Sequence, residues 1–406
     1  MSRLIFRFSK KAQIRPSAQA GAGTPRRCRF RLTYPMAEPL KNQFGAEIPT
    51  AIARMISRVS PAFQQEAFIK EALDGYDALD LMQRGKKIAT TLRCYLPDSY
   101  PEAIDILLQS LGPKLEETQG QGMSPFLYLP HTCFVAEYGL DFFEVSMTAQ
   151  YELTQRFTAE FCIRPFLERH TLATLARLKE WAGDPSPHVR RLVSEGTRPR
   201  LPWAPRLREF QKDPRPVLEL LELLKDDADL YVRRSVANNL NDIGKDHPEL
   251  LFEIARQWML GASDERRWIV KHALRSAVKR AEAGALEVMG FGAEADVSVE
   301  RVCITPRRCL IGGAVEIAFQ VTNTAAINQR VLADISIHFI KANGKASPKV
   351  FKTRTVSLAP GETVKISKSV SLAEMTTRKH YAGLHKVAVV LNGRSQPLGE
   401  FELVPK

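Results

Sequence analysis

The stretch Asp184-Pro-Ser-Pro-His-Val-Arg-Arg-Leu-Val193 decides the fold, because the chain repeats its pattern. It recurs as Asp227-Ala-Asp-Leu-Tyr-Val-Arg-Arg-Ser-Val236 and, more weakly, as Asp264-Glu-Arg-Arg-Trp-Ile-Val-Lys-His-Ala273. The three copies start 43 and 37 residues apart. A period of about 40 residues is typical of HEAT repeats, in which helix pairs stack into a curved solenoid. The repeat therefore predicts an all-α HEAT-repeat solenoid with a concave inner surface.

The helical pattern extends outward from the repeats over residues 36–292. Residues 101–111 begin with proline, carry apolar residues at helical spacing and end before Gly112-Pro113, as expected of one helix. Residues 148–167 show a second helical pattern. We find no alternation of strands with helices and no glycine-rich phosphate loop, which argues against nucleotide-cofactor chemistry.

From about Asp296 the apolar period changes to strict alternation, as in Val315, Ile317, Phe319 and Val321. Asn-Gly and Pro-Gly pairs mark turns between such runs. Seven short strands within residues 293–406 are typical of an immunoglobulin-like sandwich. We therefore expect an all-β immunoglobulin-like domain over residues 293–406.

The charge is unevenly distributed along the chain. Of the net charge of +13, residues 1–35 carry +9, residues 294–406 carry +7, and the residues between them carry −3. The bulk of the protein is therefore not a uniform polycation, and a polyanion must be met by a local basic patch. We interpret residues 1–35 as a basic, disordered extension; a start-site artefact before Met36, a transit peptide and a nucleic-acid arm are the alternatives.

The six cysteines form no CxxC pair, and the eight histidines include no HExxH motif. No run approaches the roughly 20 apolar residues that cross a membrane. We expect a reduced, cytoplasmic monomer with neither a metal site nor a membrane segment.

Basic residues recur at four-residue spacing on helices that should stack side by side. Residues four apart face the same way on a helix, so the stack would form a basic wall suited to a phosphate backbone. As the alternative, the second arginine of each Val-Arg-Arg bonds an aspartate of the scaffold. Acids inside such a wall would weaken DNA binding and need another reason to be there. The ridges are Glu152, Arg156, Glu160 and Arg164; Arg191 and Glu195; Arg234, Asn238 and Asp242; and Lys271, Arg275 and Lys279.

A proline-rich loop, residues 198–207, separates the first two repeats. Its three prolines favour an extended, rigid conformation, with Trp203 at the tip and Arg200 and Arg206 on either side. Aromatic faces stack on bases and attract cations, so we interpret Trp203 as a contact to a nucleic-acid base. A tryptophan of the core is the alternative.

Three motifs in order resemble the AlkC branch of the bacterial HEAT-repeat DNA glycosylases, of which AlkD is the sister branch. The motifs are LTQRFTAEFCIRPFL at 153–167, VRRLVSEGTRPRLPW at 189–203 and VRRSVANNLNDIGKDHP at 232–248. The resemblance covers residues 36 to about 290. One subgroup of that branch carries an immunoglobulin-like appendage, as this chain does by its strand pattern.

The resemblance implies excision of 3-methyladenine and 3-methylcytosine from double-stranded DNA, without a metal or organic cofactor. By motif it implies that Glu160 and Asp242 are the catalytic acids, and that Glu195 and Trp203 line the same pocket. We count Glu195 with the catalytic residues, in a positioning role. The chemistry agrees, because an N3-methylated base is already a cation and its glycosidic bond needs no protonation. Negative charge beside the forming oxocarbenium ion, and a positioned water, are sufficient. Whether the base is flipped out or exposed by bending stays open.

We expect double-stranded DNA as the partner of the basic wall, and we keep one alternative function. We expect a bacterial protein that associates with the nucleoid through DNA. A non-catalytic HEAT scaffold that binds DNA or protein is the alternative, and it needs neither Glu160 nor Asp242. A basic hairpin in the second domain is either a further DNA contact or a solvated face. The expected DNA-binding residues are Arg156, Arg191, Arg200, Arg234, Asn238, Lys271, Arg275, Lys341 and Lys345.

Overall fold

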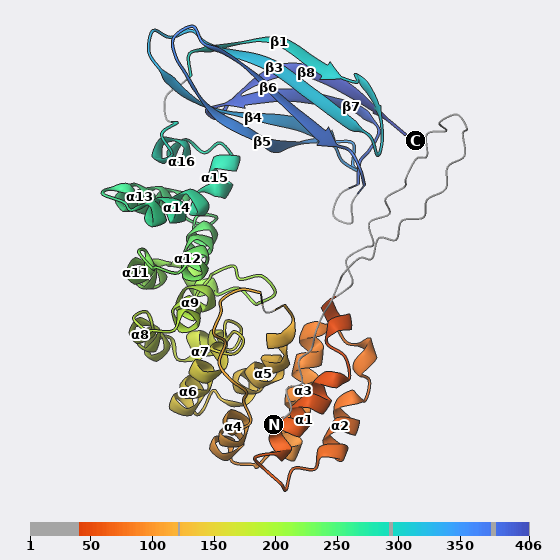
Figure 1. The fold of residues 1–406 in the computed structure, drawn as a ribbon, viewed down its shortest axis with the longest axis vertical. Helices are drawn as coiled ribbons and strands as arrows, with labels where there is room; N and C mark the ends of the chain where they lie inside the picture. The colour runs from red at the N-terminus through yellow and green to blue at the C-terminus, as the bar shows by residue number, and fades with distance from the viewer. Residues whose placement is uncertain (1–39, 121, 292–294, 375–378, 406) are drawn as a thin grey trace, which may run out of the picture.

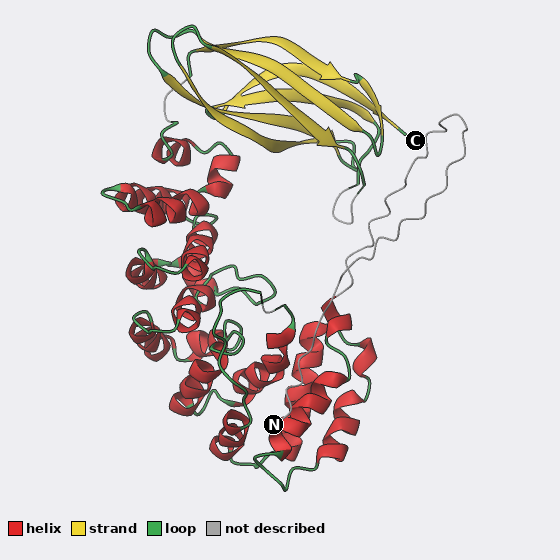
Figure 2. Cartoon of the chain, in the orientation of Figure 1, coloured by secondary structure: helices red, strands yellow, loops and turns green. Residues whose placement is uncertain are grey.

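A computed structural model describes residues 40–120, 122–291, 295–374 and 379–405 (Figure 1). All described helices precede residue 289 and all described strands follow residue 296, so the helical and strand parts do not mix (Figure 2). The expected all-α solenoid and all-β sandwich are both confirmed. The expected basic extension and the expected boundary near residues 292–293 lie outside the described residues.

The first helices pack on one another around fully buried aromatic and aliphatic side chains such as Phe44, Phe68 and Ile88. The helix that Pro101 was expected to start is present, with the proline in its first turn. The elements are η1 (Leu40–Gln43), α1 (Glu47–Ser57), α2 (Gln65–Leu73), η2 (Tyr76–Ala78), α3 (Leu81–Tyr95), α4 (Tyr100–Gln109), η3 (Ser124–Tyr128) and α5 (Leu129–Tyr138).

The following helices form the curved stack in Figure 1, with α8, α11 and α13 in an outer layer and α9, α12 and α14 in an inner layer. Each inner helix contains the Val-Arg-Arg part of one copy, or its Ile-Val-Lys counterpart in the third copy. Val189, Val232 and Ile269 are fully buried between the layers. The elements are α6 (Phe143–Thr154), α7 (Ile163–Arg169), α8 (Thr171–Trp181), α9 (Pro187–Gly196), α10 (Arg208–Lys212), α11 (Arg215–Leu224), α12 (Leu230–Ile243), α13 (Pro248–Met259), α14 (Asp264–Ala273), α15 (Arg275–Lys279) and α16 (Ala283–Val288).

The single helix expected over residues 148–167 is wrong. α6 ends at Thr154 and α7 begins at Ile163, with a turn between them. In that turn the hydroxyl of Thr158 accepts a hydrogen bond from the backbone N–H of Glu160, which competes with the helical pattern. Glu152, Arg156, Glu160 and Arg164 therefore do not share one helical ridge.

The two arginines of each repeated pair have separate roles, and the alternative that the second arginine bonds a scaffold aspartate is wrong. The first arginine of each pair serves the scaffold: Arg190 donates to Asp227 at 2.6 Å and to two backbone oxygens before its own helix. Arg233 likewise donates to the backbone oxygens of Asp227 and Ala228. The second arginine is thereby left for the inner surface.

Two sheets form the C-terminal sandwich, in the strand orders β1-β3-β6 and β2-β8-β7-β4-β5. Alternating apolar residues fill the space between them, and Phe319 and Ile335 are fully buried. The eighth strand beyond the expected seven is the three-residue β2, which pairs in parallel with β8. The strands are β1 (Val297–Thr305), β2 (Arg308–Leu310), β3 (Ala314–Asn323), β4 (Gln329–Ile340), β5 (Ala346–Leu358), β6 (Thr363–Ser371), β7 (Gly383–Leu391) and β8 (Arg394–Val404).

The described residues contain neither a candidate membrane-spanning helix nor a cluster of candidate metal ligands. None of their helices is both long and apolar enough to span a bilayer. Nor do their His, Cys, Asp and Glu side chains gather in a group of three that could hold a metal ion.

The buried imidazole of His131 in α5 should make the helical part sensitive to acid. Neither ring nitrogen has a hydrogen-bond partner within the described residues, and burial lowers the pKa of His131 from 6.5 to about 4. Between these two pH values His131 is protonated in the unfolded chain but stays neutral in the folded protein. Stability that is complete above pH 6.5 should therefore fall by about 3 kcal/mol as the pH approaches 4.

Urea unfolding followed by helical circular dichroism across this pH window measures the effect. A His131→Leu variant, which has no titratable group here, should lose that part of the pH dependence. Equal pH dependence in the variant and the natural protein would contradict the assignment.

Candidate functional site

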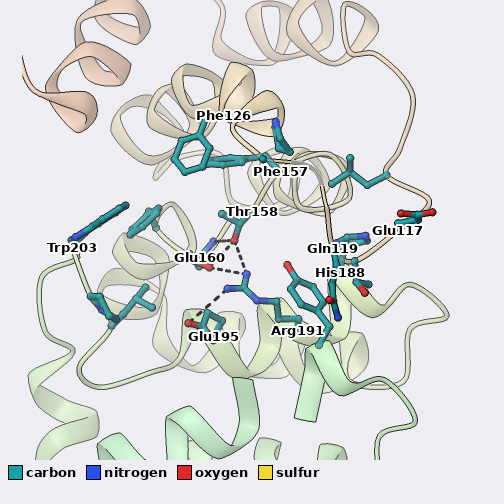
Figure 3. Close-up of a pocket in the computed structure, with 18 of the residues that line it drawn as sticks. Glu117, Gln119, Phe126, Phe157, Thr158, Glu160, His188, Arg191, Glu195 and Trp203 are labelled. Carbon is teal, nitrogen blue, oxygen red and sulfur yellow. Dashed lines mark hydrogen bonds and ion pairs between the residues drawn. The ribbon is translucent and has the colours of Figure 1, made fainter. Parts of the chain in front are cut away.

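A cavity of about 430 Å³ opens on the inner side of the stack (Figure 3). The inner helix α9 supplies His188, Arg191 and Glu195, which share one face because they are three and four residues apart. The turn between α6 and α7 supplies Glu160, and the proline-rich loop supplies Trp203. The other lining residues are Leu115, Glu117, Thr118, Gln119, Gly120, Gly122, Pro125, Phe126, Phe157, Thr158, Phe161, Arg198, Leu201, Pro202 and Tyr231.

Glu160 lines the cavity and is held by hydrogen bonds and an ion pair (Figure 3). Its Oε2 accepts from Arg191 Nη1 at 2.7 Å and from the hydroxyl of Thr158 at 2.9 Å. Arg191 Nη1 also donates to Thr158 Oγ1 at 3.1 Å, and its guanidinium lies 5.0 Å from the centre of the Tyr231 ring. Glu160 therefore has a fixed position and keeps an oxygen free of these bonds.

Glu195 is more deeply buried and is bound on both oxygens. Its Oε1 accepts from Arg198 Nη1 at 2.6 Å, and its Oε2 accepts from the hydroxyl of Ser235 on α12 at 2.6 Å. Burial raises the pKa of this carboxyl, but Arg191 and Arg198 outweigh burial, and the pKa of Glu195 lies below its ordinary value. The carboxylate is charged at neutral pH.

Asp242 lies beneath this layer and does not line the cavity, in contrast to the expectation for a catalytic acid. Its side chain is 2% exposed. One oxygen accepts from both Arg198 Nε and Arg198 Nη2 at 2.8 Å, and the other accepts from Lys245 Nζ at 2.6 Å. In this arrangement the Arg198 guanidinium separates Asp242 from the cavity, so Asp242 reaches a nucleotide only if Arg198 moves.

The charges of this network balance. Arg198 joins Glu195 to Asp242, and Arg191 joins Glu160 to the edge of Glu195 at 3.7 Å. The carboxylates are thus already paired with arginine or lysine, and already oriented, before a cation enters the cavity. The six groups are Glu160, Glu195 and Asp242, which are negative, and Arg191, Arg198 and Lys245, which are positive.

Trp203 stands at one side of the cavity, across from His188 and Gln119 (Figure 3). It is 65% exposed, which excludes the alternative of a core tryptophan. Its φ of 65° lies in the left-handed region, which non-glycine residues rarely adopt. An exposed indole in a constrained backbone conformation is a surface suited to stacking.

The expected DNA contacts separate into engaged and free groups. Arg156 donates to the Gly112 carbonyl and to Glu152, and Arg200 is paired with Asp246, so these two side chains are held within the protein rather than presented as free cations. Arg191 is engaged with the carboxylates, and Arg275 donates to Asn238. Within the described residues, the exposed cations without an ion-pair partner are Arg234, Lys271, Lys341 and Lys345 of the predicted set.

The sequence interpretation missed several residues of the site, Arg198 above all. Arg198 stood in the quoted motif, but spacing alone does not reveal that it bridges two carboxylates. Tyr231 was detectable, because it occupies the position of His188 in the next repeat copy, and the two rings pack edge to face at 5.6 Å. Phe126 and Phe157 form an aromatic pair at the opposite wall, with ring centres 4.9 Å apart.

A second, smaller cavity of about 240 Å³ lies where the last helices meet the sandwich. One acid, Asp334, lines it, and burial raises the pKa of Asp334. Phe291 lies under the guanidinium of Arg330 at 4.8 Å. Cations from both parts of the chain line this cavity: Lys271, Arg275, Arg330, Lys352 and Arg354.

Three comparisons relate the chain to known proteins. A family model described as "Uncharacterised protein YhaZ, C-terminal Ig-like domain" matches residues 298–405. The uncharacterized protein YhaZ of Bacillus subtilis is 35% identical over 365 residues, which are 90% of this chain and 99% of that protein. The solved structure of the Pseudomonas fluorescens alkylpurine DNA glycosylase AlkC, bound to DNA containing an abasic site analog, has a TM-score of 0.83 and 40% identity. That similarity covers 90% of this chain and 100% of the other.

Proposed function

The chain belongs to the family of the alkylpurine DNA glycosylase AlkC and of YhaZ, and from this premise we propose that it is a monofunctional DNA glycosylase. Its substrates are cationic alkylated bases in duplex DNA, namely 3-methyladenine and 3-methylcytosine. It acts as a monomer on the bacterial nucleoid, in the cytoplasm, and needs no metal or organic cofactor.

The observation that carries the proposal is a pair of oriented carboxylates facing an open cavity beside an exposed indole. Glu160 and Glu195 line the cavity with Trp203, and both carboxylates are fixed by hydrogen bonds. A cationic base is attracted to an indole face, and fixed negative charge stabilises a cationic transition state. A scaffold protein has no use for this arrangement.

The reaction follows from the charges. The bond between C1′ and the base nitrogen breaks, its electron pair goes to the base, and the methylated base leaves as a neutral molecule. The positive charge passes to the sugar as an oxocarbenium ion, which the Glu160 carboxylate stabilises. Water adds to C1′ and gives up its proton to Glu160 or to solvent, so an abasic site remains. Glu195 and Asp242 hold Arg198, and through it the geometry of the site.

The lining residues support hydrolysis rather than lyase chemistry. Among the described residues that line the cavity there is no lysine. A Schiff base with the sugar needs an amine, so the DNA strand should stay intact after the base has left.

The test is an incubation of methylated duplex DNA with the protein, followed by mass spectrometry of the released bases. Release of 3-methyladenine and 3-methylcytosine, with an unbroken abasic strand and no borohydride-trapped adduct, is expected. If no methylated base is released, the scaffold function replaces the enzyme. A trapped adduct would refute the monofunctional mechanism alone.

DNA should run along the inner layer toward the sandwich. Arg234 on α12 and Lys271 on α14 are exposed and unpaired within the described part of the chain, and Lys271 also lines the cavity at the junction. That cavity brings five cations together against one acid, which is the charge pattern of a phosphate site. Lys341 and Lys345 stand in the hairpin between β4 and β5, a further contact for the backbone.

Charge reversal tests this path. Arg234→Glu and Lys271→Glu should each weaken binding to any duplex, whatever its sequence. Each should also reduce the slope of log affinity against log salt by about one, because a phosphate contact is lost. Fluorescence anisotropy at several salt concentrations measures both quantities. Lys179→Glu, which makes the same charge change on the exposed surface of outer helix α8, is the control. Equal effects of all three variants would point to net charge rather than to this path.

A further inference from the structure

Arg164 of α7 lies beneath the loop that carries Trp203. The four-residue spacing placed Arg164 on the basic inner wall, but the structure buries it, with 3% of its surface exposed. Within the described residues no carboxylate lies at ion-pair distance from its guanidinium. Burial lowers the pKa of Arg164 to about 10, so the group stays charged at neutral pH. A buried cation without an acidic partner calls for an explanation in its other contacts.

Those contacts are three backbone carbonyls of one segment. Arg164 Nη1 donates to the carbonyl of Gly196 at 3.0 Å and to that of Arg198 at 2.8 Å. Arg164 Nη2 donates to the carbonyl of Pro205. The guanidinium thus joins the C-terminal end of α9 to the far side of the proline-rich loop, with Trp203 between the anchored points.

The loop needs such an anchor because its own backbone bonds are few. Pro199, Pro202 and Pro205 have no N–H to donate. The backbone hydrogen bonds within the loop are long: Leu207 N to Pro199 O is 3.3 Å, and Ala204 N to Leu201 O is 3.4 Å. Trp203 itself has a left-handed φ, an unfavourable conformation that persists only when its surroundings enforce it.

We propose that Arg164 is a positioning residue, which holds Trp203 in place at the cavity by fixing the backbone on both sides of the indole. The position of Arg198 depends less on Arg164 than that of Trp203 does, because the Arg198 side chain is also held by Glu195 and Asp242. This inference rests on the proposed function, in which Trp203 contacts the alkylated base.

The test is a double-mutant cycle between Arg164 and Trp203, read as single-turnover release of 3-methyladenine. Arg164→Met should slow release by about tenfold to a hundredfold, because a displaced contact group loses its geometry. In a Trp203→Ala background the same change should slow release by less than about threefold, because the group that Arg164 positions is gone. Arg164→Lys, which keeps the charge but has one amine for three carbonyls, should fall between Met and the natural residue.

Arg84 offers a matched control in α3, away from the cavity. It is also buried and donates to four backbone carbonyls, those of Lys41, Phe44, Asp77 and Leu79. Arg84→Met should reduce thermal stability as Arg164→Met does, but leave the excision rate of the folded protein unchanged. If Arg164→Met does not fold, the Lys variant takes its place in the cycle.

A second readout does not need activity. The fluorescence anisotropy of Trp203, taken as the difference between each protein and its Trp203→Phe version, should fall in Arg164→Met and stay unchanged in Arg84→Met. An equal slowing by Arg164→Met with and without Trp203, or an unchanged anisotropy, would overturn the inference. If the natural protein releases no methylated base, the proposed function fails, and the anisotropy alone decides whether Arg164 positions the indole.

Discussion

Replacing Glu160 with glutamine should slow the release of 3-methyladenine by about a hundredfold to a thousandfold, with DNA affinity nearly unchanged. The amide keeps the size of the side chain and an oxygen to accept the bond from Arg191, which is 2.7 Å from the carboxylate. It removes the charge that faces the oxocarbenium ion, a loss of about 3–4 kcal/mol for a preorganised contact of this kind. Single-turnover kinetics with excess enzyme measure the chemical step directly.

Glu117 provides the control for this variant. It lines the same cavity, but it is exposed and stands on the loop before η3, without the arginine that orients Glu160. Glu117→Gln removes the same charge and should change the rate much less. Glu195→Gln should have an intermediate effect, because its oxygens orient Arg198 and Ser235 and one edge faces the cavity. An unchanged rate in Glu160→Gln would show that the acid acts only as a partner of Arg191.

The repeat pattern was sufficient to predict the helical architecture, whereas the meeting of distant residues at one site was implied by the AlkC resemblance. The motifs placed Glu160, Glu195 and Trp203 in one pocket although they come from three segments, and all three line the cavity. The alternating pattern likewise predicted the sandwich, apart from the short β2. The helical stack and the sandwich depend on periodicity and local turn chemistry, which a sequence expresses directly. The AlkC family resemblance is confirmed by the matches over 90% of the chain.

The partners of the charged residues could not be predicted in the same way. Spacing indicates which face of a helix carries Arg191, but not that its guanidinium meets Glu160 from another segment. The same holds for Arg156 and Arg200, which donate to groups 44 and 46 residues away. The turn at Thr158 defeated the helical prediction because one hydroxyl can compete with the backbone. Contacts between segments thus decide which cations are free for DNA.

Replacing Asp242 with asparagine should also slow base release by about a hundredfold or more, although Asp242 does not face the cavity. Its two oxygens accept three bonds from Arg198 and Lys245, and an amide nitrogen at either position would oppose a donor. The six-group network would change from neutral to a net charge of +1. Arg198 would then be less firmly held. If its guanidinium moved toward the cavity, its positive charge would repel a cationic base. Asp246→Asn is the control, because Asp246 holds Arg200 through two similar bonds outside the cavity, and its rate should change little.

Combining Asp242→Asn with Arg198→Gln distinguishes an indirect role of Asp242, through Arg198, from a direct contact with the sugar. If Asp242 acts by holding Arg198, the Arg198→Gln variant has already lost that contribution. Asp242→Asn should then slow base release by less than about a further threefold in that background. If Arg198 moves away when DNA binds and Asp242 contacts the sugar directly, the two losses should multiply. The structure favours the first outcome, because the guanidinium is bonded to Asp242 on one side and to Glu195 on the other and so separates the buried acid from the cavity. Multiplying losses would instead restore Asp242 as a catalytic acid, with Arg198 as the group that uncovers it.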